Sequence, residues 1–240
     1  MSTLSIPMPL QIVVDDVGWW SGWDGSDFNQ PFRTGMSRDH VPGDYAALAR
    51  LGKGLGMKVL AGFVLCEWDS RGILKNLPSA TWMGQDWCPH RVNDNHKQEA
   101  AGIIKDSGNY LEIALHGIGH EFWKNGAMER AEFHDNSCRM RNRDEVRRHL
   151  EFFQKILEQQ NFSPSPTVFI PPAMKHSFGQ ENEGIQKLLK EAGIVRVINC
   201  FQKARQLAPP LYPTATWENG VVILDRGLPD FSWNSESCSP

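Results

Sequence analysis

The stretch Tyr110-Leu-Glu-Ile-Ala-Leu-His-Gly-Ile-Gly-His120 joins a strand-like apolar run, residues 110–115, to two histidines four positions apart. Two glycines, Gly117 and Gly119, separate His116 from His120. Glycines disfavour a regular helix and suit a tight turn at the end of a strand. The stretch therefore predicts a strand that delivers two imidazoles to its carboxyl end. The alternative is two unrelated polar histidines in a surface loop.

A second strand-like run, residues 11–14, ends in the acidic pair Asp15 and Asp16. Two imidazoles and one carboxylate are ligands of a catalytic divalent metal ion and leave coordination positions open. Adjacent carboxylates repel each other, and a bound cation would offset that repulsion. Successive strand residues point to opposite sides, so one aspartate could bind the metal while the other faces the substrate. A turn or helix-capping role for the pair is the alternative.

The rest of the chain alternates between strand-like and helix-like stretches. Apolar runs predict strands over residues 11–14, 58–65, 110–115, 167–170, 195–199 and 221–224. Helical spacing of apolar residues predicts helices over 44–55, 97–105, 144–160 and 183–192, with a polar loop over about 68–95. Such alternation is typical of parallel βαβ units.

Candidate site residues follow the predicted strands, and ligand sites of parallel α/β folds gather at the carboxyl ends of strands. These residues are Asp15, Asp16, Glu67, His116, Pro172 and Asp225. About six strands are visible, too few for a complete barrel. We therefore expect a single α/β domain over residues 1–240 that forms a deformed or incomplete (β/α) barrel.

Composition limits the partners that the chain can have. Hydrophobic residues make up 40% and charged residues 22% of the chain, and the formal net charge is −3. We expect no general attraction to nucleic acid or to an anionic membrane. The basic cluster within residues 139–148 also holds Asp144 and Glu145, which is typical of a solvated helix face.

The sequence also gives expectations about cellular location and about the cysteines. No apolar run approaches the ~20 residues that cross a bilayer. Residues 1–10 lack the features of a signal peptide, so the chain as given is expected to be cytoplasmic, with a removed leader left open. The five cysteines form no Cys-x-x-Cys pair, which signals neither a disulfide framework nor a zinc knuckle.

The chain has nine tryptophans, and several follow the candidate site residues. Trp19, Trp20 and Trp23 come after the acidic pair, and Trp123 comes after His120. Large aromatics pack cores but also line ligand pockets. Trp19 and Trp123 are therefore candidate substrate contacts. Glu67 is another, with solvation of a loop as its alternative role.

Three segments resemble the motifs of a known family. Val-Val-Asp-Asp-Val-Gly (13–18) looks like the first motif of the polysaccharide deacetylase family, carbohydrate esterase family 4, also called the NodB-homology domain. The segment from His116 to His120 is similar to its second motif. Phe-Ile-Pro-Pro-Ala-Met (169–174) resembles the third. The likeness is to a divergent, deacetylase-like branch, and it implies the deformed barrel named above.

The resemblance implies roles for these residues. Asp15 would be the catalytic base, and Asp16, His116 and His120 would bind a divalent metal, expected to be zinc. The metal would activate a water molecule to attack an amide or ester carbonyl. The implied reaction is N-deacetylation of an acetylated sugar or polysaccharide.

The third motif implies a backbone N–H donor beside a proline. A proline itself has no N–H, so Pro172 rather than Pro171 would be the functional proline. Ala173 would then supply the N–H that binds the oxyanion.

The chain departs from the family pattern in two places. Ile170 stands where the family has an arginine that pairs with the catalytic aspartate, and Arg226 is the suggested replacement. The family's terminal histidine, which acts as general acid, has no counterpart. His176 is the first candidate for that role and His134 the second.

Two other functions stay open for the same site. One is a carbohydrate-binding protein with a degenerate site. The other is a metal-independent glycoside hydrolase, which needs two carboxylates flanking the sugar bond. Asp15 with Glu67 or Asp225 could supply that pair.

Overall fold

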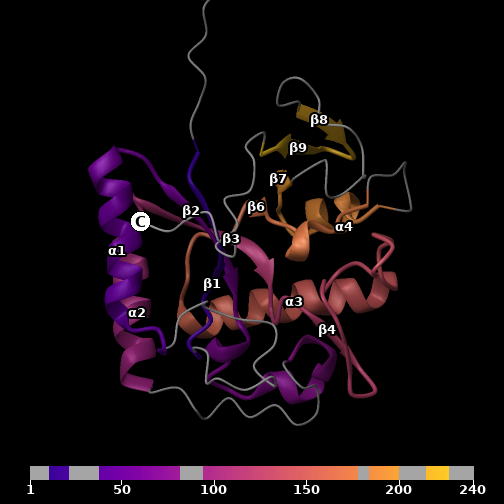
Figure 1. Cartoon of the computed structure of the whole chain (residues 1–240), viewed down its shortest axis with the longest axis horizontal. Helices are drawn as coiled ribbons and strands as arrows, with labels where there is room; N and C mark the ends of the chain where they lie inside the picture. Colours follow the sequence, from indigo (N-terminus) through magenta and orange to yellow (C-terminus); the bar gives the residue numbers. More distant parts are fainter. Residues whose placement is uncertain (1–10, 22–37, 82–93, 178–183, 200–214, 227–240) are drawn as a thin grey trace, which may run out of the picture.

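A seven-stranded sheet dominates the computed structural model, which describes residues 11–21, 38–81, 94–177, 184–199 and 215–226. The strand order is β1-β2-β3-β6-β7-β9-β8, and every neighbouring pair is parallel except β8 and β9 (Figure 1). The strands are β1 (Val13–Val17), β2 (Val59–Val64), β3 (Leu111–Gly117), β6 (Val168–Phe169), β7 (Arg196–Asn199), β8 (Ala215–Glu218) and β9 (Val221–Asp225). The predicted mixed α/β class with a mostly parallel sheet is confirmed.

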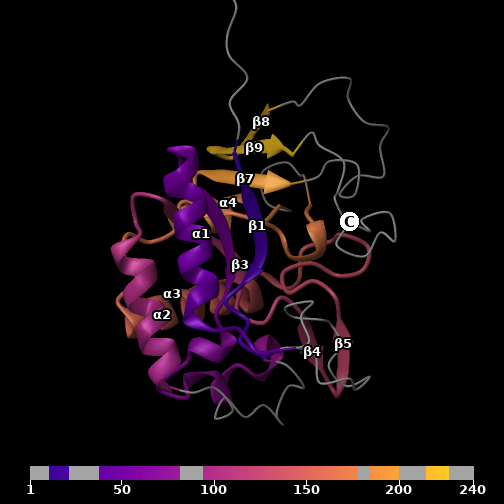
Figure 2. The same cartoon turned by 60° about the vertical axis from the view of Figure 1, so that its left-hand side comes forward.

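In the described part of the chain, four α-helices and a small hairpin flank the sheet. They are α1 (Pro42–Leu55), α2 (Asp94–Asp106), α3 (Arg143–Gln160), α4 (Gln186–Glu191) and the antiparallel pair β4 (Phe122–Lys124) and β5 (Ala127–Glu129). Helices α1 and α2 contact each other and stand together along one side of the sheet, with the hairpin on the other side (Figure 2). The hairpin follows β3 directly, so it lies close to the carboxyl end of that strand.

The sheet separates two apolar clusters. The larger one packs sheet residues against the helices. The smaller one has buried members from four strands and from the segment after β6, with β1 and β9 side chains packed against it: Leu60, Ala114, Val168, Ile170, Met174 and Ile198, with Val13 and Leu224. We call the face with the smaller cluster the inner face. Because side chains alternate along a strand, His116 and Arg226 share this face with Ala114 and Leu224.

The sheet is strongly curved. Four strands lie between β1 and β9 in the strand order, yet Arg226 Nη2 lies 2.6 Å from Asp15 Oδ1. Only a sheet that bends back on itself brings these two strands so close. Within the described residues β1 pairs with β2 alone, so the barrel is not closed. The expectation of an incomplete barrel agrees with this geometry.

The structure departs from the predicted elements at several points. Strand β1 does not stop before the acidic pair but includes Asp15 and Asp16. The short, partly exposed strands β4, β5 and β8 were not predicted, because they lack a continuous apolar run. The predicted loop over 68–95 holds short 3₁₀ segments, and its residues 82–93 lie outside the described part. Part of the helix predicted over 183–192 also lies outside it.

Two expectations drawn from composition can be compared with the described residues. None of their helices combines the length and apolar character needed to cross a lipid bilayer. Cys66 is buried and Cys138 is half-buried. A cytoplasmic location stays a prediction.

The start of α1 is fixed by local chemistry. Pro42 occupies the first turn, where a missing N–H costs nothing. Asp44 Oδ2 accepts the Val41 N–H at 2.9 Å, and the same carboxylate pairs with Arg38 at 2.8 Å. The Arg38 hydrogen bond is the largest cause that lowers the pKa of Asp44, and the pKa falls to about 2 although partial burial opposes the shift.

We predict that Asp44→Ala lowers the free energy of unfolding by about 1 kcal/mol at pH 7, because a first-turn acceptor and its charge are lost. A lowered folded-state pKa stabilises the fold above the ordinary pKa and is lost as pH falls through the folded-state value. The difference between wild type and variant should therefore shrink between about pH 4 and pH 2. Urea unfolding across this range measures it. Asp144→Ala, at the more exposed start of α3, is the control and should cost less.

Candidate functional site

A β-bulge re-aims the acidic pair. Val14 pairs with Ala61 and Val17 pairs with Phe63, so β1 places two residues, Asp15 and Asp16, opposite one residue of β2. Asp16 has a φ of 57°, in the left-handed region. Such an extra residue bends a strand and turns its side chains. The chain thus turns at the acidic pair.

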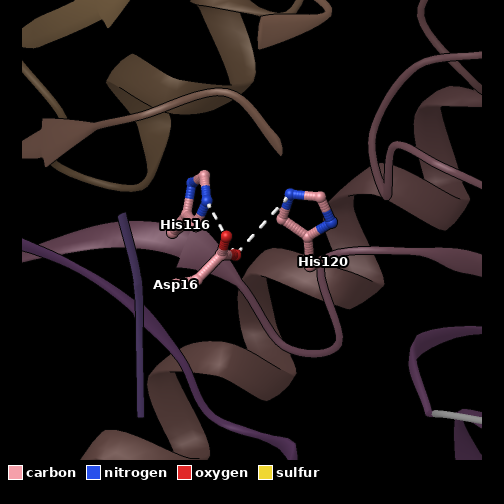
Figure 3. Close-up of side chains that lie close together, drawn as sticks. All are labelled: Asp16, His116 and His120. Carbon is pink, nitrogen blue, oxygen red and sulfur yellow. Dashed lines mark ion pairs between the residues drawn. The ribbon is translucent and has the colours of Figure 1, made fainter. Parts of the chain in front are cut away.

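Asp16, His116 and His120 form a cluster at the ends of β1 and β3 (Figure 3). Asp16 Oδ1 lies 3.5 Å from His116 Nε2 and 3.8 Å from His120 Nε2. One candidate ligand atom from each residue lies within 4.8 Å of the other two. Both imidazoles are buried, whereas the Asp16 side chain is 39% exposed. The cluster therefore faces solvent on the aspartate side.

The second nitrogen of each imidazole is held by an acceptor. His116 Nδ1 lies 2.7 Å from the Ile170 carbonyl oxygen, and His120 Nδ1 lies 3.1 Å from Glu121 Oε1. Each Nδ1 must carry the hydrogen that it donates, so each neutral ring turns an Nε2 lone pair toward Asp16. Two lone pairs and a carboxylate that face one another fit a divalent cation, and this donor set suits zinc.

The electrostatics of the cluster favour a positive charge beside Asp16, whether a proton on His116 or a bound cation. Burial acts to raise the pKa of Asp16, but His120, His116 and Arg130 together hold that pKa well below its ordinary value. Burial lowers the pKa of His116, but Asp16 outweighs burial and raises it. The surroundings thus favour a negative carboxylate beside a positive partner.

Asp15 lies beside the cluster and is held by an arginine from the other end of the sheet. Arg226 Nη2 donates to Asp15 Oδ1 at 2.6 Å, and the backbone N–H of Arg226 donates to the Asn199 carbonyl. Arg226 thus supplies the arginine partner that Ile170 lacks, as the sequence suggested. Ile170 contributes its carbonyl oxygen to His116 instead.

The proline segment also reaches the cluster. Pro172 is buried and begins a 3₁₀ turn, η7 (Pro172–Met174), in which Ala173 has a φ of 52°. The Ala173 N–H donates to His120 Nε2 at 3.1 Å. The N–H predicted to bind a substrate oxygen therefore does point at the cluster.

Two predicted substrate contacts are packed inside the protein. Trp19 is 2% exposed and Glu67 is 3% exposed. Glu67 accepts the Trp20 N–H at 2.6 Å and the Ser21 hydroxyl at 2.7 Å, so its carboxylate fixes the segment after β1. Trp123 on β4 is half-buried. Contact of these residues with a substrate stays a prediction, and Trp23 lies outside the described residues.

The candidate proton donors are buried as well. His176 is 1% exposed, with its Nε2 3.1 Å from Gln186 Nε2. His134 packs its ring against His176, and its Nε2 accepts the Ser177 N–H. Burial, followed by Arg141, lowers the pKa of His134 to about 3, so His134 is neutral at pH 7. A proton-donor role for His176 stays a prediction.

Alternation along β9 decides the placement of Asp225. Ile223 belongs to the larger apolar cluster, and Asp225 lies two residues further on the same face. Its side chain therefore points away from Asp15 and Arg226. The pairing of Asp15 with Glu67 or Asp225 as the two carboxylates of a glycosidase stays a prediction.

Two acidic residues near the cluster were not identified from the sequence. Glu121 accepts from His120, and Glu132 accepts the backbone N–H groups of Ile118, Gly119 and His120. Glu121 follows a candidate ligand directly, which could have suggested its role. Nothing in the sequence pattern marks Glu132.

Comparison with known proteins gives few matches. No family model matches the chain, and the comparison with curated proteins finds no match. The solved structures found include a 4-α-glucanotransferase from Thermococcus litoralis, with 16% identity and a TM-score of 0.40 over 75% of this chain and 23% of that enzyme. A GH57-type branching enzyme from the hyperthermophilic archaeon Pyrococcus horikoshii has 16% identity and a TM-score of 0.46, over 90% of this chain and 46% of that enzyme.

These comparisons correct the predicted function. No family model matches, the deacetylase family included, and the two structures named above are by name a glucanotransferase and a GH57-type branching enzyme rather than deacetylases. The prediction of a metal-dependent hydrolase of C–N bonds that deacetylates a sugar is therefore wrong. This chain spans less than half the length of either enzyme.

We predict that Gly117→Ala destabilises the fold by about 2 kcal/mol, because Gly117 has a φ of 120° and an added Cβ would run into Glu132 Oε2. Gly54→Ala is the matched control. Gly54 is an exposed glycine inside α1 with open space around it, so its replacement should stabilise the fold by up to about 1 kcal/mol. Urea unfolding of both variants measures the contrast. Equal effects of the two changes would show that the turn does not need its glycine.

Proposed function

We propose that the chain is a hydrolase that acts on a carbohydrate. Its centre would comprise the carboxylate of Asp15 and the cluster of Asp16, His116 and His120, which would bind a divalent cation. The observation that carries the proposal is the β-bulge, which turns both aspartates toward functional partners. One carboxylate meets two imidazole lone pairs and the other meets a guanidinium.

The cation assignment is supported by the donor set. His116 and His120 each donate from Nδ1 to an oxygen and turn Nε2 toward Asp16, which is how metal-binding histidines are oriented by their second partners. When bound, a divalent ion at these three residues would supply Lewis-acid polarisation of a substrate oxygen. The exposed side of Asp16 is the side from which a substrate could approach.

The chain's own residues would handle protons and substrate oxygens. Hydrolysis needs a base to take a proton from the attacking water and an acid to give a proton to the leaving oxygen, a role for which His176 stays the predicted donor. We assign the role of the base to Asp15, whose negative charge is balanced by Arg226 and whose position is fixed by the same contact. The Ala173 N–H, which points at His120 Nε2, would donate to a substrate oxygen bound beside the cluster.

A carbohydrate substrate is compatible with the same chemistry. Sugars present hydroxyl groups on adjacent carbons, and two such oxygens can occupy the open positions of one ion. Asp15 can accept and the Ala173 N–H can donate hydrogen bonds to further hydroxyls. Glycosidic bonds are therefore the first bonds to test, with soluble α-glucans among the substrates.

We predict about one bound divalent ion per chain in protein loaded with zinc, and almost none in the His116→Ala/His120→Ala double variant. A three-ligand site loses most of its affinity when its imidazoles are removed. Mass spectrometry of the metal content measures this, with His96→Ala, an exposed histidine on α2, as the control that keeps its metal. Stoichiometric metal in the double variant would refute the site.

We predict that Asp15→Asn keeps the bound ion but lowers kcat by about 10²–10⁴-fold, because an amide cannot take the proton. Asp16→Asn should weaken the binding of the ion itself. Release of reducing sugar from a panel of glucans and aryl glycosides measures kcat. Asp225→Asn, next to Arg226 but on the opposite face of β9, is the control and should keep full activity.

Two outcomes decide against the proposal. Metal-loaded wild type that releases no sugar from any member of the panel would exclude a glycoside hydrolase of this substrate range. Loss of the ion in Asp15→Asn with full retention in Asp16→Asn would reverse the roles assigned to the two aspartates.

A further inference from the structure

Glu132 is a buried carboxylate beneath the turn that carries His120. It is 1% exposed, and its Oε2 accepts the N–H groups of Ile118, Gly119 and His120 at 2.8, 3.0 and 3.0 Å. Three consecutive N–H groups that converge on one oxygen form a concave anion-binding site in the backbone. The turn thus closes around an acceptor from another part of the chain.

The other oxygen of Glu132 is tied to α3. His149 Nδ1 lies 2.8 Å from Glu132 Oε1, and His149 Nε2 lies 2.9 Å from Ser79 Oγ. His149 itself is 1% exposed and stacks on Phe122 of β4. One carboxylate therefore links the turn after β3 to a helix, and the helix to the 3₁₀ segment that holds Ser79.

The turn has little room to adopt another shape while these contacts persist. A Cβ at Gly117 would run into Glu132 Oε2, and a Cβ at Gly119 would run into the Ala80 carbonyl oxygen. His120 has a φ of 64°, which a side-chain-bearing residue adopts only when its surroundings hold it there. The hydrogen bonds to Glu132 supply that hold directly, because one of them is to the His120 N–H.

We propose that Glu132 is the positioning residue of the cluster. It keeps residues 118–120 in the conformation that turns His120 Nε2 toward Asp16. Its effect on metal binding rests on the proposed function, whereas its effect on the turn does not. Without this acceptor the three N–H groups would seek water, and His120 would leave the left-handed region and with it the cluster.

The test compares Glu132→Ala with Asp69→Ala. Asp69 is a matched control because it is also buried and also accepts backbone N–H groups, from Leu74 at 2.9 Å and Arg71 at 3.2 Å. Its described hydrogen bonds are with the segment after β2 and with Gln159 near the end of α3, and none is with residues 118–120. Both variants therefore lose stability, but only Glu132→Ala loses the support of the turn. Glu132→Ala should weaken zinc binding about 10–100-fold relative to wild type, and Asp69→Ala should leave it unchanged.

Conservative variants separate positioning from folding. Glu132→Gln keeps one oxygen for the three N–H groups, and its amide can donate to His149 once that ring changes tautomer. Zinc affinity should therefore stay within about threefold of wild type. Glu132→Asp keeps the charge but draws the oxygens back from the turn, so affinity should fall. This variant carries the test if Glu132→Ala does not fold.

Amide hydrogen exchange measures how firmly the turn is held, and it does so in metal-free protein. The amides of residues 118–120 should be protected in metal-free wild type and in Asp69→Ala. In Glu132→Ala they should exchange at least about tenfold faster, since they lose a buried acceptor. If wild type binds no zinc, the metal site fails and this measurement alone decides the role of Glu132. Unchanged protection in Glu132→Ala, or zinc affinity equal to that of Asp69→Ala, would overturn the inference.

Discussion

The site is governed by one electrostatic constraint, which is that three hydrogen-bond acceptors are made to face one another. While both rings are neutral, Asp16 Oδ1, His116 Nε2 and His120 Nε2 are all acceptors, and only the Ala173 N–H, which donates to His120 Nε2, relieves their repulsion among the contacts described above. Nothing in local sequence preference brings the three atoms together. Much of the surrounding structure holds that arrangement. The Ile170 carbonyl and Glu121 orient the imidazoles, and the curved sheet brings their strands to one rim. A repulsive arrangement that is so fully supported is typical of a binding site rather than of packing.

Unfavourable backbone conformations at the cluster add to the cost of the repulsion between its acceptors. Asp16, His120 and Ala173 all have positive φ values, at 57°, 64° and 52°, and none is a glycine. A side-chain-bearing residue in this region costs about 1–2 kcal/mol. These three residues come from three separate segments, and each provides an atom at the cluster. Positive φ values also occur in turns elsewhere in the described residues, but at these three positions the strained residue itself supplies an atom at the cluster. In the strand, the turn and the proline-bearing loop, one residue with an unfavourable φ value directs one group toward the cluster.

The fold was largely predictable, because buried parallel strands are continuous apolar runs, as in β2 with all six residues buried, and α1 and α3 show helical spacing. The gathering of the site residues at the carboxyl ends of the strands was also predictable, since parallel strands end on one edge of the sheet. The β-bulge at Asp15 and Asp16 was not, because it exists only in register with β2. Glu132 was missed because its partners are set by tertiary packing. The activity was wrongly assigned because two histidines and an aspartate occur in several kinds of hydrolase. Such a set of ligand atoms indicates that a cation could bind, but it does not show which bond of a substrate is hydrolysed.

The contact between Asp15 and Arg226 joins residues 211 positions apart, the first strand of the sheet to the end of its last parallel strand. During synthesis, Asp16, His116 and His120, the proposed cation ligands, emerge from the ribosome well before Arg226 does. Through most of synthesis the chain therefore holds Asp15 without its counter-charge. Closing so long a segment is slow and entropically costly, so this ion pair is expected to form late in folding. The proposed cation ligands are therefore expected to come together before Asp15 acquires its partner Arg226.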